Sequence, residues 1–424
     1  MTNGNTIDDS GAALVSFDEE FADMIRRLRP RASSVKEWMQ TGAAPTNDTL
    51  AYETLADHGD GAPLDIERAG DDTLMIYTGG TTGMPKGVVW THQAMRAAQL
   101  SALAAIGPAP ATMDDHRAFV AGNNEIKPFM PACPWMHGTG LSTAVSQICF
   151  AQPIVTVDSK VGLNPDGIWK AAADHRVHQI AIVGDAFAKP MLAALDSMDN
   201  APDLSGLAIM ISSGAMWSRE VKEEMLDRIP QLIIADMFGA SETLAYGATF
   251  STKENITDTA KIVLTANTTV LKEDNARAKA GETGLIAIKG TIGEGYFGDR
   301  EKTDKTYRMI DGERWCIPGD WAEVCEDGSV ILLGRGSNCI NTAGEKVFPE
   351  EVEEVLKRAD GVKDALVVGV PDEKWGNAVV AVVTSDSLYH GDTGDEETLR
   401  GFVSDRLARY KSPKRIFFTA QTLR

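Results

Sequence analysis

The sequence predicts an α/β protein with a large N-terminal domain, built of layered α/β sheets and a small β region, followed by a small α+β C-terminal domain. The chain has 424 residues, and a chain of this length normally divides into two or more domains. From residue 73 onward, short apolar runs alternate with amphipathic helical patterns, as in helices that connect parallel strands. After Gly281 the pattern changes to short strands and turns, and a compact unit begins near Gly334-Arg335.

The first 72 residues combine a helical pattern over residues 17–28 with a polar stretch rich in glycine and aspartate around residues 58–61. We expect them to form a connector that leads to the first strand, Leu74-Met75-Ile76-Tyr77. Further apolar runs predict strands at residues 179–183, 207–212 and 232–235, and a helix at residues 217–228.

The later elements are predicted in the same way. In the small β region, strands are expected at residues 284–290 and within residues 322–333, where Glu326-Asp327-Gly328 supplies a turn. The C-terminal pattern predicts a helix (349–358), two strands (365–370 and 378–384), a helix (396–410) and a strand (415–419). We therefore divide the chain into domains of residues 1–334 and 335–424.

Charge and composition exclude several classes of partner. With 41 basic and 61 acidic residues the formal net charge is −20, which repels nucleic acid and anionic membranes. No apolar run has the length of a membrane span, and the acidic N-terminus does not resemble a signal peptide. We expect a cytoplasmic protein without integral membrane contact, and homo-oligomerisation stays open. The five cysteines are scattered, which predicts reduced thiols rather than a disulfide framework.

The most informative motif is Tyr77-Thr-Gly-Gly-Thr-Thr-Gly-Met-Pro-Lys-Gly-Val-Val-Trp90. Its glycines allow backbone amides to converge on an anion, three threonines add hydroxyl donors, and Lys86 adds positive charge. The spacing differs from that of a P-loop, which requires Gly-Lys-Ser/Thr after four intervening residues. A glycine-rich hairpin turn would explain the glycines but not the threonines and the lysine. The motif therefore predicts a loop that binds the phosphates of a nucleotide.

This loop resembles the signature loop of the adenylate-forming superfamily, the AMP-dependent ligases that include acyl-CoA synthetases. Further segments resemble the same superfamily in the same order from about residue 73 to the end of the chain. The resemblance implies that ATP, Mg²⁺ and coenzyme A are used, and that a small-molecule carboxylic acid is the substrate. The phosphate-binding residues would be Thr78, Gly79, Gly80, Thr81, Thr82, Gly83 and Lys86.

Two segments that follow apolar strands carry the resemblance for the adenine and the metal. In Ser212-Ser-Gly-Ala-Met216, Gly214 and Ala215 would approach the adenine. In Met237-Phe-Gly-Ala-Ser-Glu242, Phe238 would stack on the adenine beside Gly239, Ala240 and Ser241. Glu242 would bind Mg²⁺ with Thr78 nearby, because a hard cation that bridges phosphates prefers carboxylate, hydroxyl and water oxygens.

Two further segments resemble the acyl and ribose sites. Pro131-Ala-Cys-Pro-Trp-Met-His-Gly-Thr-Gly140 would place His137 at the junction between the acyl group and the adenylate. Cys316-Ile-Pro-Gly-Asp320 and Leu333-Gly-Arg335 resemble the ribose-binding pair. A carboxylate such as Asp320 can accept from both ribose hydroxyls, and Arg335 can donate to ribose or phosphate oxygens.

Residues 334–353 resemble the hinge into a mobile C-terminal domain, with Ser337 where many relatives have Asp or Lys. The turn Ala343-Gly344-Glu345 would lie beside the pantetheine of coenzyme A. The sequences of the phosphate loop, of residues 184–190 and of this hinge are similar to those of acyl-CoA synthetases that act on bulky acids such as steroid side-chain carboxylates.

The resemblance thus implies an AMP-forming acyl-CoA ligase. Relatives have a longer region before the phosphate loop and continue past the last segment to a lysine that bridges the carboxylate and the α-phosphate. We therefore expect this chain to lack its first subdomain, to stop before the catalytic lysine and to adenylate slowly. Two alternatives stay open: an adenylate-forming enzyme that does not use coenzyme A, and a nucleotide-binding truncated remnant with little adenylation activity.

Overall fold

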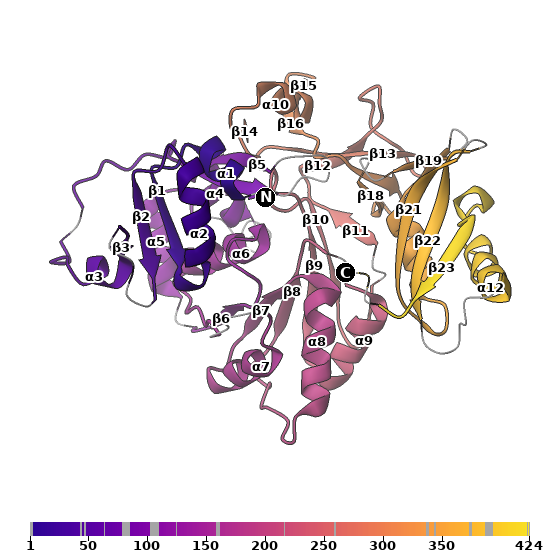
Figure 1. Ribbon diagram of the computed structural model, residues 1–424, viewed down its shortest axis with the longest axis horizontal. Coiled ribbons are helices and arrows are strands. Elements are labelled where there is room, and N and C mark those ends of the chain that lie inside the picture. Colours follow the sequence, from indigo (N-terminus) through magenta and orange to yellow (C-terminus); the bar gives the residue numbers. More distant parts are fainter. Residues whose placement is uncertain are drawn as a thin grey trace.

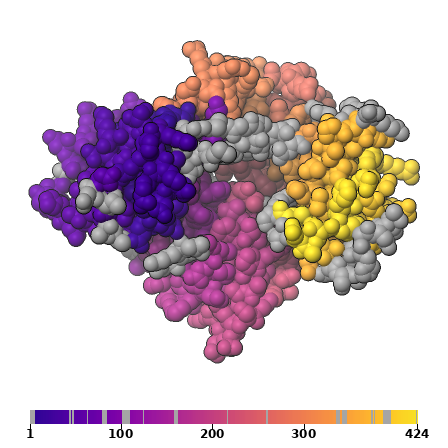
Figure 2. Space-filling view, in the orientation of Figure 1, coloured from indigo at the N-terminus to yellow at the C-terminus, as the bar shows by residue number. Residues whose placement is uncertain are grey.

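The computed structural model describes residues 3–423 except 43–44, 46–47, 63, 79–84, 102–109, 124, 158–161, 216, 258–259, 336–338, 343–344, 373–374, 386–392 and 422. In these residues the strands form four sheets. The N-terminal and C-terminal sheets lie at opposite ends of the molecule, with the central sheet between them (Figure 1). In Figure 2 the N-terminal residues (indigo) and the C-terminal residues (yellow) lie on these opposite sides. The α/β class and the small C-terminal unit are confirmed.

The N-terminal residues form a parallel sheet where the sequence predicted a connector. Strand β1 (Leu14–Asp18) pairs with β2 (Glu37–Thr41), and β2 pairs with β3 (Leu50–Ala51). The accompanying helices are α1 (Asn3–Ser10), α2 (Ala22–Leu28) and α3 (Tyr52–Ala56). The prediction of a helix from residue 17 was wrong at its start, because residues 14–18 pair with β2 instead.

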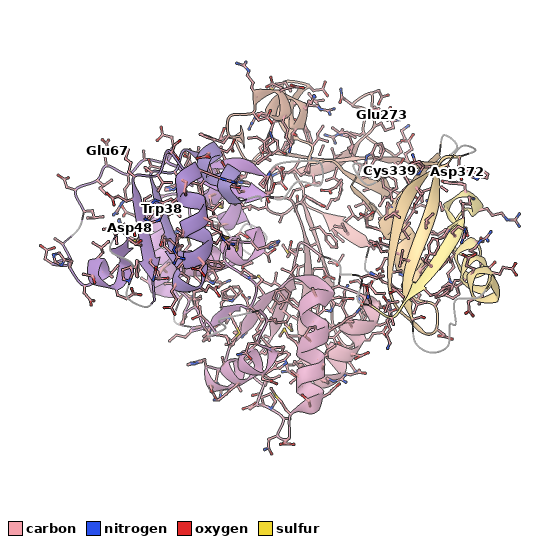
Figure 3. All side chains as sticks on the ribbon, in the orientation of Figure 1. Trp38, Asp48, Glu67, Glu273, Cys339 and Asp372 are labelled. Carbon is pink, nitrogen blue, oxygen red and sulfur yellow. The ribbon has the colours of Figure 1, made fainter. Side chains whose placement is uncertain are left out.

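Two contacts of Arg29 connect neighbouring segments of this small sheet. Its guanidinium lies 5.1 Å from the centre of the Trp38 ring, and it forms an ion pair with Asp48. Trp38 and Asp48 lie on the same side of the molecule in Figure 3. Arg29 therefore connects the segment after α2 with β2 and with the chain that leads to β3.

The parallel half of the central sheet contains four strands and the helices around them. Neighbouring strands are parallel in the order β6 (Phe129–Pro131), β7 (Gln179–Ile182), β8 (Ile209–Ser212) and β9 (Ile233–Phe238). The helices are α6 (Gly138–Cys149), α7 (Pro165–Asp174), α8 (Gly184–Ser197) and α9 (Arg219–Arg228). The predicted strands and helix of this region are confirmed, with boundaries that shift by a few residues.

Alternate residues of these strands serve two different cores, as the two-residue period of a strand requires. Met130, Ile180 and Ile182 belong to the larger core, which contains residues of α7, α8 and α9. Phe129 and Ala181 face a second core with Ala144 of α6. Figure 1 shows α7, α8 and α9 along the lower part of the molecule beside β7 and β8. Burial on both faces explains why these strands are short continuous apolar runs.

Beyond β9 the central sheet becomes antiparallel. The order continues from β9 through β10 (Gly247–Ser251), β11 (Lys261–Leu264), β18 (Val330–Arg335), β17 (Asp320–Val324), β13 (Thr283–Lys289), β16 (Glu313–Cys316) and β15 (Tyr307–Ile310). Strand β12 (Thr268–Leu271) pairs with β13. The predicted change to short strands and turns after Gly281 is confirmed.

A separate three-stranded sheet flanks the predicted phosphate loop. Strands β4 (Thr73–Thr78) and β5 (Lys86–Thr91) form an antiparallel hairpin, and β14 (Gly295–Tyr296) pairs with the other edge of β5. Helices α4 (His92–Ser101) and α5 (Met113–Gly122) follow the hairpin, and α10 (Arg300–Thr306) follows β14. Residues 79–84, which join β4 to β5, lie outside the described residues.

The C-terminal sheet has the order β20 (Glu345–Val347), β19 (Ile340–Thr342), β22 (Gly376–Ser385) and β21 (Val362–Asp372), and β23 (Arg415–Thr419) pairs with β22. Helices α11 (Pro349–Lys357) and α12 (Thr393–Ser404) cover its core. The predicted helix to residue 410 was too long, because the chain turns after α12 and Leu407 packs on this core.

None of the five cysteines, all of which lie in the described part of the chain, forms a disulfide. Within the described part of the chain, the helices lack the combination of length and apolar character that a membrane span requires.

A buried ion pair ties α9 to the central sheet. The ammonium of Lys222, fully buried on α9, lies 2.5 Å from the carboxylate of Asp236 on β9. Burial raises the pKa of Asp236 above its usual range, and the ammonium opposes this shift. Removing one partner leaves a buried charge without compensation, which costs about 3–5 kcal/mol.

We therefore expect Lys222→Met to lower the free energy of unfolding by about 3–5 kcal/mol at pH 8. Without the lysine, the folded-state pKa of Asp236 rises further above the unfolded value of about 3.9. The loss therefore grows as the pH rises through the folded-state pKa and is smaller at pH 5.

Urea denaturation at both pH values measures this difference. Lys170→Met, which removes a lysine from an exposed ion pair on α7, is the matched control and should change stability little. An equal loss for Lys222→Met at pH 5 and pH 8 would contradict the role of Asp236.

Candidate active site

A cavity of about 630 Å³ opens at the carboxyl ends of β8 and β9, next to the β4–β5 hairpin. Open α/β sheets bind ligands at this end of their strands. The cavity lining brings together predicted site residues from five separate segments: Thr78, His137, Gly214, Ala215, Phe238, Gly239, Ala240, Ser241 and Asp320.

His137 and Gly214 meet on one side of the cavity. Gly214 has φ +89° and a side chain there would meet His137, since a Cβ would lie 2.9 Å from Cε1 of the imidazole. His137 is the N-cap of α6, and its Nδ1 accepts a hydrogen bond from the Thr139 amide at 3.3 Å. Burial lowers the pKa of His137. The neutral ring therefore carries its proton on Nε2, which leaves a neutral N–H donor at the cavity.

The turn after β9 is fixed by two close contacts. A Cβ on Gly239 would lie 1.5 Å from the carbonyl oxygen of Leu244, so the turn accepts no side chain at this position. The indole of Trp90, fully buried on β5, donates to the carbonyl of Ser241 at 2.8 Å. The turn that carries Phe238 and Glu242 is therefore attached directly to the strand that follows the predicted phosphate loop.

Glu242, unlike its neighbour Ser241, is not among the residues that line the cavity. Its side chain is buried and accepts a hydrogen bond from the Tyr296 hydroxyl. Burial, with the nearby carboxylate of Glu242, raises the pKa of Tyr296 well above its usual range, so the tyrosine remains a donor. A carboxylate has acceptor capacity beyond this one bond.

The residues that the structure describes contain no cluster of three or more His, Cys, Asp or Glu side chains able to hold a metal ion. A Mg²⁺ ion at Glu242 would therefore resemble the sites in which one or two carboxylates share the ion with substrate phosphates and water. The single carboxylate fits that kind of site.

Lys86 is turned toward a protein carboxylate. It forms an ion pair with Asp299 and is not among the cavity-lining residues. Thr78 and Lys86 are opposite each other at the end of the β4–β5 ladder. The predicted phosphate-loop motif thus contains the end of β4, the residues that join the two strands, and most of β5. Gly79, Gly80, Thr81, Thr82 and Gly83 lie outside the described residues.

Asp320 also lines the cavity. It is buried at the start of β17, within 3.3 Å of the Tyr246 hydroxyl, which donates to it. Its backbone is opposite Arg335 in the β17–β18 pair, although the arginine side chain is not described. Ala343 and Gly344 lie outside the described residues, and of Glu345 only the backbone in β20 is described.

Several residues at this site are not predicted from the sequence. Asp236 and Tyr246 line the cavity, and Glu350 reaches it from α11. A Cβ on Gly334 would meet the Glu350 carboxylate at 2.3 Å, so α11 lies close against the end of β18. A lysine at position 222, among the apolar Val221, Met225 and Leu226, was a signal for a buried partner such as Asp236. Tyr246 and Glu350 had no comparable local signal.

Two family models match the chain. The model described as "AMP-binding enzyme" matches residues 4–297, and the model "AMP-binding enzyme C-terminal domain" matches residues 351–423. The first match includes the N-terminal sheet and all the predicted site segments up to β14.

Curated relatives match nearly the whole chain. A medium/long-chain-fatty-acid–CoA/3-oxocholest-4-en-26-oate–CoA ligase of Mycobacterium marinum is 35% identical over 98% of this chain and 77% of its own length. A 3-oxocholest-4-en-26-oate–CoA ligase of Rhodococcus rhodochrous is also 35% identical, over 98% of this chain and 76% of its own length. The chain thus spans about three quarters of the length of these relatives.

Solved structures share the fold. ATP-bound MatB from Rhodopseudomonas palustris has a TM-score of 0.77 and 23% identity, covering 99% of this chain and 78% of that protein. The o-succinylbenzoate CoA synthetase of Bacillus subtilis, in complex with its acyl-adenylate, has a TM-score of 0.73 and 21% identity, covering 100% and 78%. The chain therefore belongs to the AMP-binding enzyme family, and within it to the AMP-forming ligases that join an acid to a thiol.

Proposed function

We propose that this chain activates a bulky carboxylic acid, of the steroid side-chain type, with ATP and transfers the acyl group to coenzyme A. In the first step the carboxylate attacks the α-phosphorus and pyrophosphate leaves. In the second step the thiol of coenzyme A attacks the acyl carbonyl and AMP leaves. The observation that carries the proposal is the cavity that joins Thr78, His137, Phe238 and Asp320 at one end of the sheet.

The nucleoside would bind between β8, β9 and β17. Phe238 offers an aromatic face for the adenine, and Gly214 leaves room for close approach because it has no side chain. Asp320 would accept hydrogen bonds from both ribose hydroxyls. Its burial supports this role, since a hydrogen bond to a carboxylate is stronger where water is excluded.

The phosphates would lie over the base of the hairpin. Thr78 and Lys86 are at the two ends of the loop between β4 and β5, so both can approach an anion that the loop binds. Glu242 would hold the Mg²⁺ ion, which would neutralise charge on the phosphate oxygens. Tyr296 supports the proposal because its hydrogen bond orients the Glu242 carboxylate.

His137 would act at the junction of the acyl group and the α-phosphate. A neutral Nε2–H can donate a hydrogen bond to an oxygen there without adding a full charge. Positioning and electrostatic stabilisation, rather than covalent chemistry of the protein, would carry the first step.

A large acid is supported by the relatives' names and by the cavity itself. The relatives from M. marinum and R. rhodochrous are named for 3-oxocholest-4-en-26-oate. Part of the cavity is lined by apolar side chains: Ile76, Met136, Ile211, Trp217, Met237, Leu244 and Leu332. Its volume of about 630 Å³ lies within the range of small-molecule sites.

Coenzyme A would approach along the turn at residues 343–345, and the domains would divide at Gly334-Arg335, where β18 ends. The closeness of Glu350 to Gly334 supports a boundary at this point, because α11 there touches the larger domain. The cytoplasmic location and the oligomeric state stay predictions.

Acid-dependent exchange of pyrophosphate into ATP tests the proposed function directly. We expect a steroid-type carboxylate to support faster exchange than acetate at equal concentration, and addition of coenzyme A to yield the thioester, detected by mass spectrometry. Faster exchange with acetate would refute the bulky substrate. If ATP binds but no acid supports exchange, the nucleotide-binding alternative is favoured.

The ribose assignment predicts that Asp320→Ala weakens AMP and adenosine binding alike. A hydrogen bond to a charged group contributes about 1.5–3 kcal/mol, which is roughly one to two orders of magnitude in Kd. Calorimetric titration measures the change, and Asp320→Asn tests the charge at nearly constant size. Glu323→Ala on the same strand is the control. Equal affinity of the parent protein for ATP and its 2′,3′-dideoxy analogue would be incompatible with this role.

Burial of His137 predicts that its imidazole titrates below the ordinary value of about 6.5. The folded protein then binds this proton less readily than the unfolded chain. The free energy of unfolding therefore has its full value above about pH 6.5, and it decreases as the pH falls through the lower folded-state pKa of His137. Histidine NMR titration, with the signal assigned by its absence in His137→Gln, checks the shift. A midpoint at or above 6.5 would contradict it.

A further inference from the structure

Asp299 binds the lysine that the proposed function assigns to phosphate. Its Oδ2 forms the ion pair with Nζ of Lys86, and the two side chains are 24% and 33% exposed. The other carboxylate oxygen of Asp299 caps α10, accepting from the Lys302 amide at 3.0 Å. The carboxylate cannot turn away from Lys86 freely, because the same side chain holds the first turn of the helix.

The backbone around Asp299 is attached to the phosphate hairpin. Strand β14, which precedes Asp299, pairs with β5 through Gly295 opposite Val89 and Tyr296 opposite Val88. The amide of Phe297 donates to the carbonyl of Gly87 at 2.8 Å. Asp299 is therefore positioned from the strand next to the one that carries Lys86.

The same segment also reaches the candidate metal carboxylate. Tyr296 donates its hydroxyl to Glu242, and the ammonium of Lys302 lies 4.4 Å from the centre of the Tyr296 ring. Residues 295–303 thus contact both groups that would face the departing pyrophosphate, Lys86 on one side and Glu242 on the other.

The ion pair reduces the net positive charge that Lys86 presents to an anion. Lys86 holds the pKa of Asp299 below its usual range, so the carboxylate is ionised at neutral pH. A paired lysine presents little net positive charge, and a polyphosphate that reaches it must also approach the carboxylate. An ammonium has three donors, so Lys86 can bind an anion while it keeps Asp299.

We propose that Asp299 is a counter-ion of the phosphate-binding lysine that weakens the binding of pyrophosphate and so promotes its release after adenylation. The inference rests on the proposed function, since it requires Lys86 to bind phosphate. It assigns Asp299 a positioning and tuning role that acts through Lys86, without contact with the reacting atoms.

Asp299→Asn tests the inference, because asparagine caps a helix about as well as aspartate and removes only the charge. We expect pyrophosphate to bind the variant about three- to tenfold more tightly than the parent protein, since one repulsive charge near the anion is gone. The gain should shrink at high ionic strength. In steady-state assays, pyrophosphate should inhibit the variant at correspondingly lower concentration.

Glu301→Gln is the matched control. It makes the same change of charge on the same helix, but Glu301 is exposed and pairs with Lys305. We expect its affinity for pyrophosphate to equal that of the parent protein. In the Lys86→Ala background, Asp299→Asn should bring a smaller gain, because only the direct repulsion of the anion by Asp299 is then removed, as a double-mutant cycle of calorimetric titrations would show.

Equal or weaker binding by Asp299→Asn would overturn the inference, and so would an equal gain in Glu301→Gln or in the Lys86→Ala background. A different result would refute the phosphate assignment of the proposed function. If Lys86→Ala binds pyrophosphate as well as the parent protein, the phosphate assignment is wrong, and the inference falls with it. A clear effect of Lys86→Ala without a gain in Asp299→Asn overturns the inference alone.

Discussion

The hydrogen bond from the Trp90 indole to the Ser241 carbonyl is the contact on which the site geometry depends. Trp90 is fully buried on β5, where its N–H cannot reach water and requires a protein acceptor. That acceptor lies in the turn that carries Phe238 and Glu242. Because β5 also pairs with β4 on one side and β14 on the other, the β4–β5 hairpin, the turn that carries Glu242 and the Asp299 segment all take their positions from one strand.

Local pairing explains how an acidic protein can offer a site to an anionic nucleotide. The net charge of −20 disfavours polyphosphate at long range, and three carboxylates, Asp236, Asp320 and Glu350, line the cavity. Of these, Asp320 is the carboxylate to which the proposed function assigns the ribose hydroxyls. At the hairpin end the cavity offers the hydroxyls of Thr78 and Ser241, and the charge of Lys86 is moderated by Asp299. Under the proposed function, the ribose would therefore bind beside Asp320 and the phosphates would bind at the hairpin.

The sequence predicted the parts of the site that short segments define. Phe238 ends a strand before a glycine, Gly214 lies two residues after a strand, and Asp320 begins a strand after a glycine. Such local patterns can be recognised without knowledge of tertiary contacts. The partners of these residues could not be predicted in this way, since Lys86 and Asp299 are 213 positions apart. The N-terminal sheet was missed because its strands are short and its β3 has only two residues. Helix α12 was predicted too long because the turn that ends it depends on packing of Leu407.

A crystal structure with a stable acyl-adenylate analogue tests the central claim most directly, because it locates nucleotide and acyl group together. We expect the adenine against Phe238, both ribose hydroxyls within hydrogen-bonding distance of Asp320, and the phosphoryl group between His137 and the β4–β5 hairpin. The acyl group should occupy the apolar part of the same cavity. An analogue bound outside this cavity, or bound in it with the ribose away from Asp320, would contradict the account.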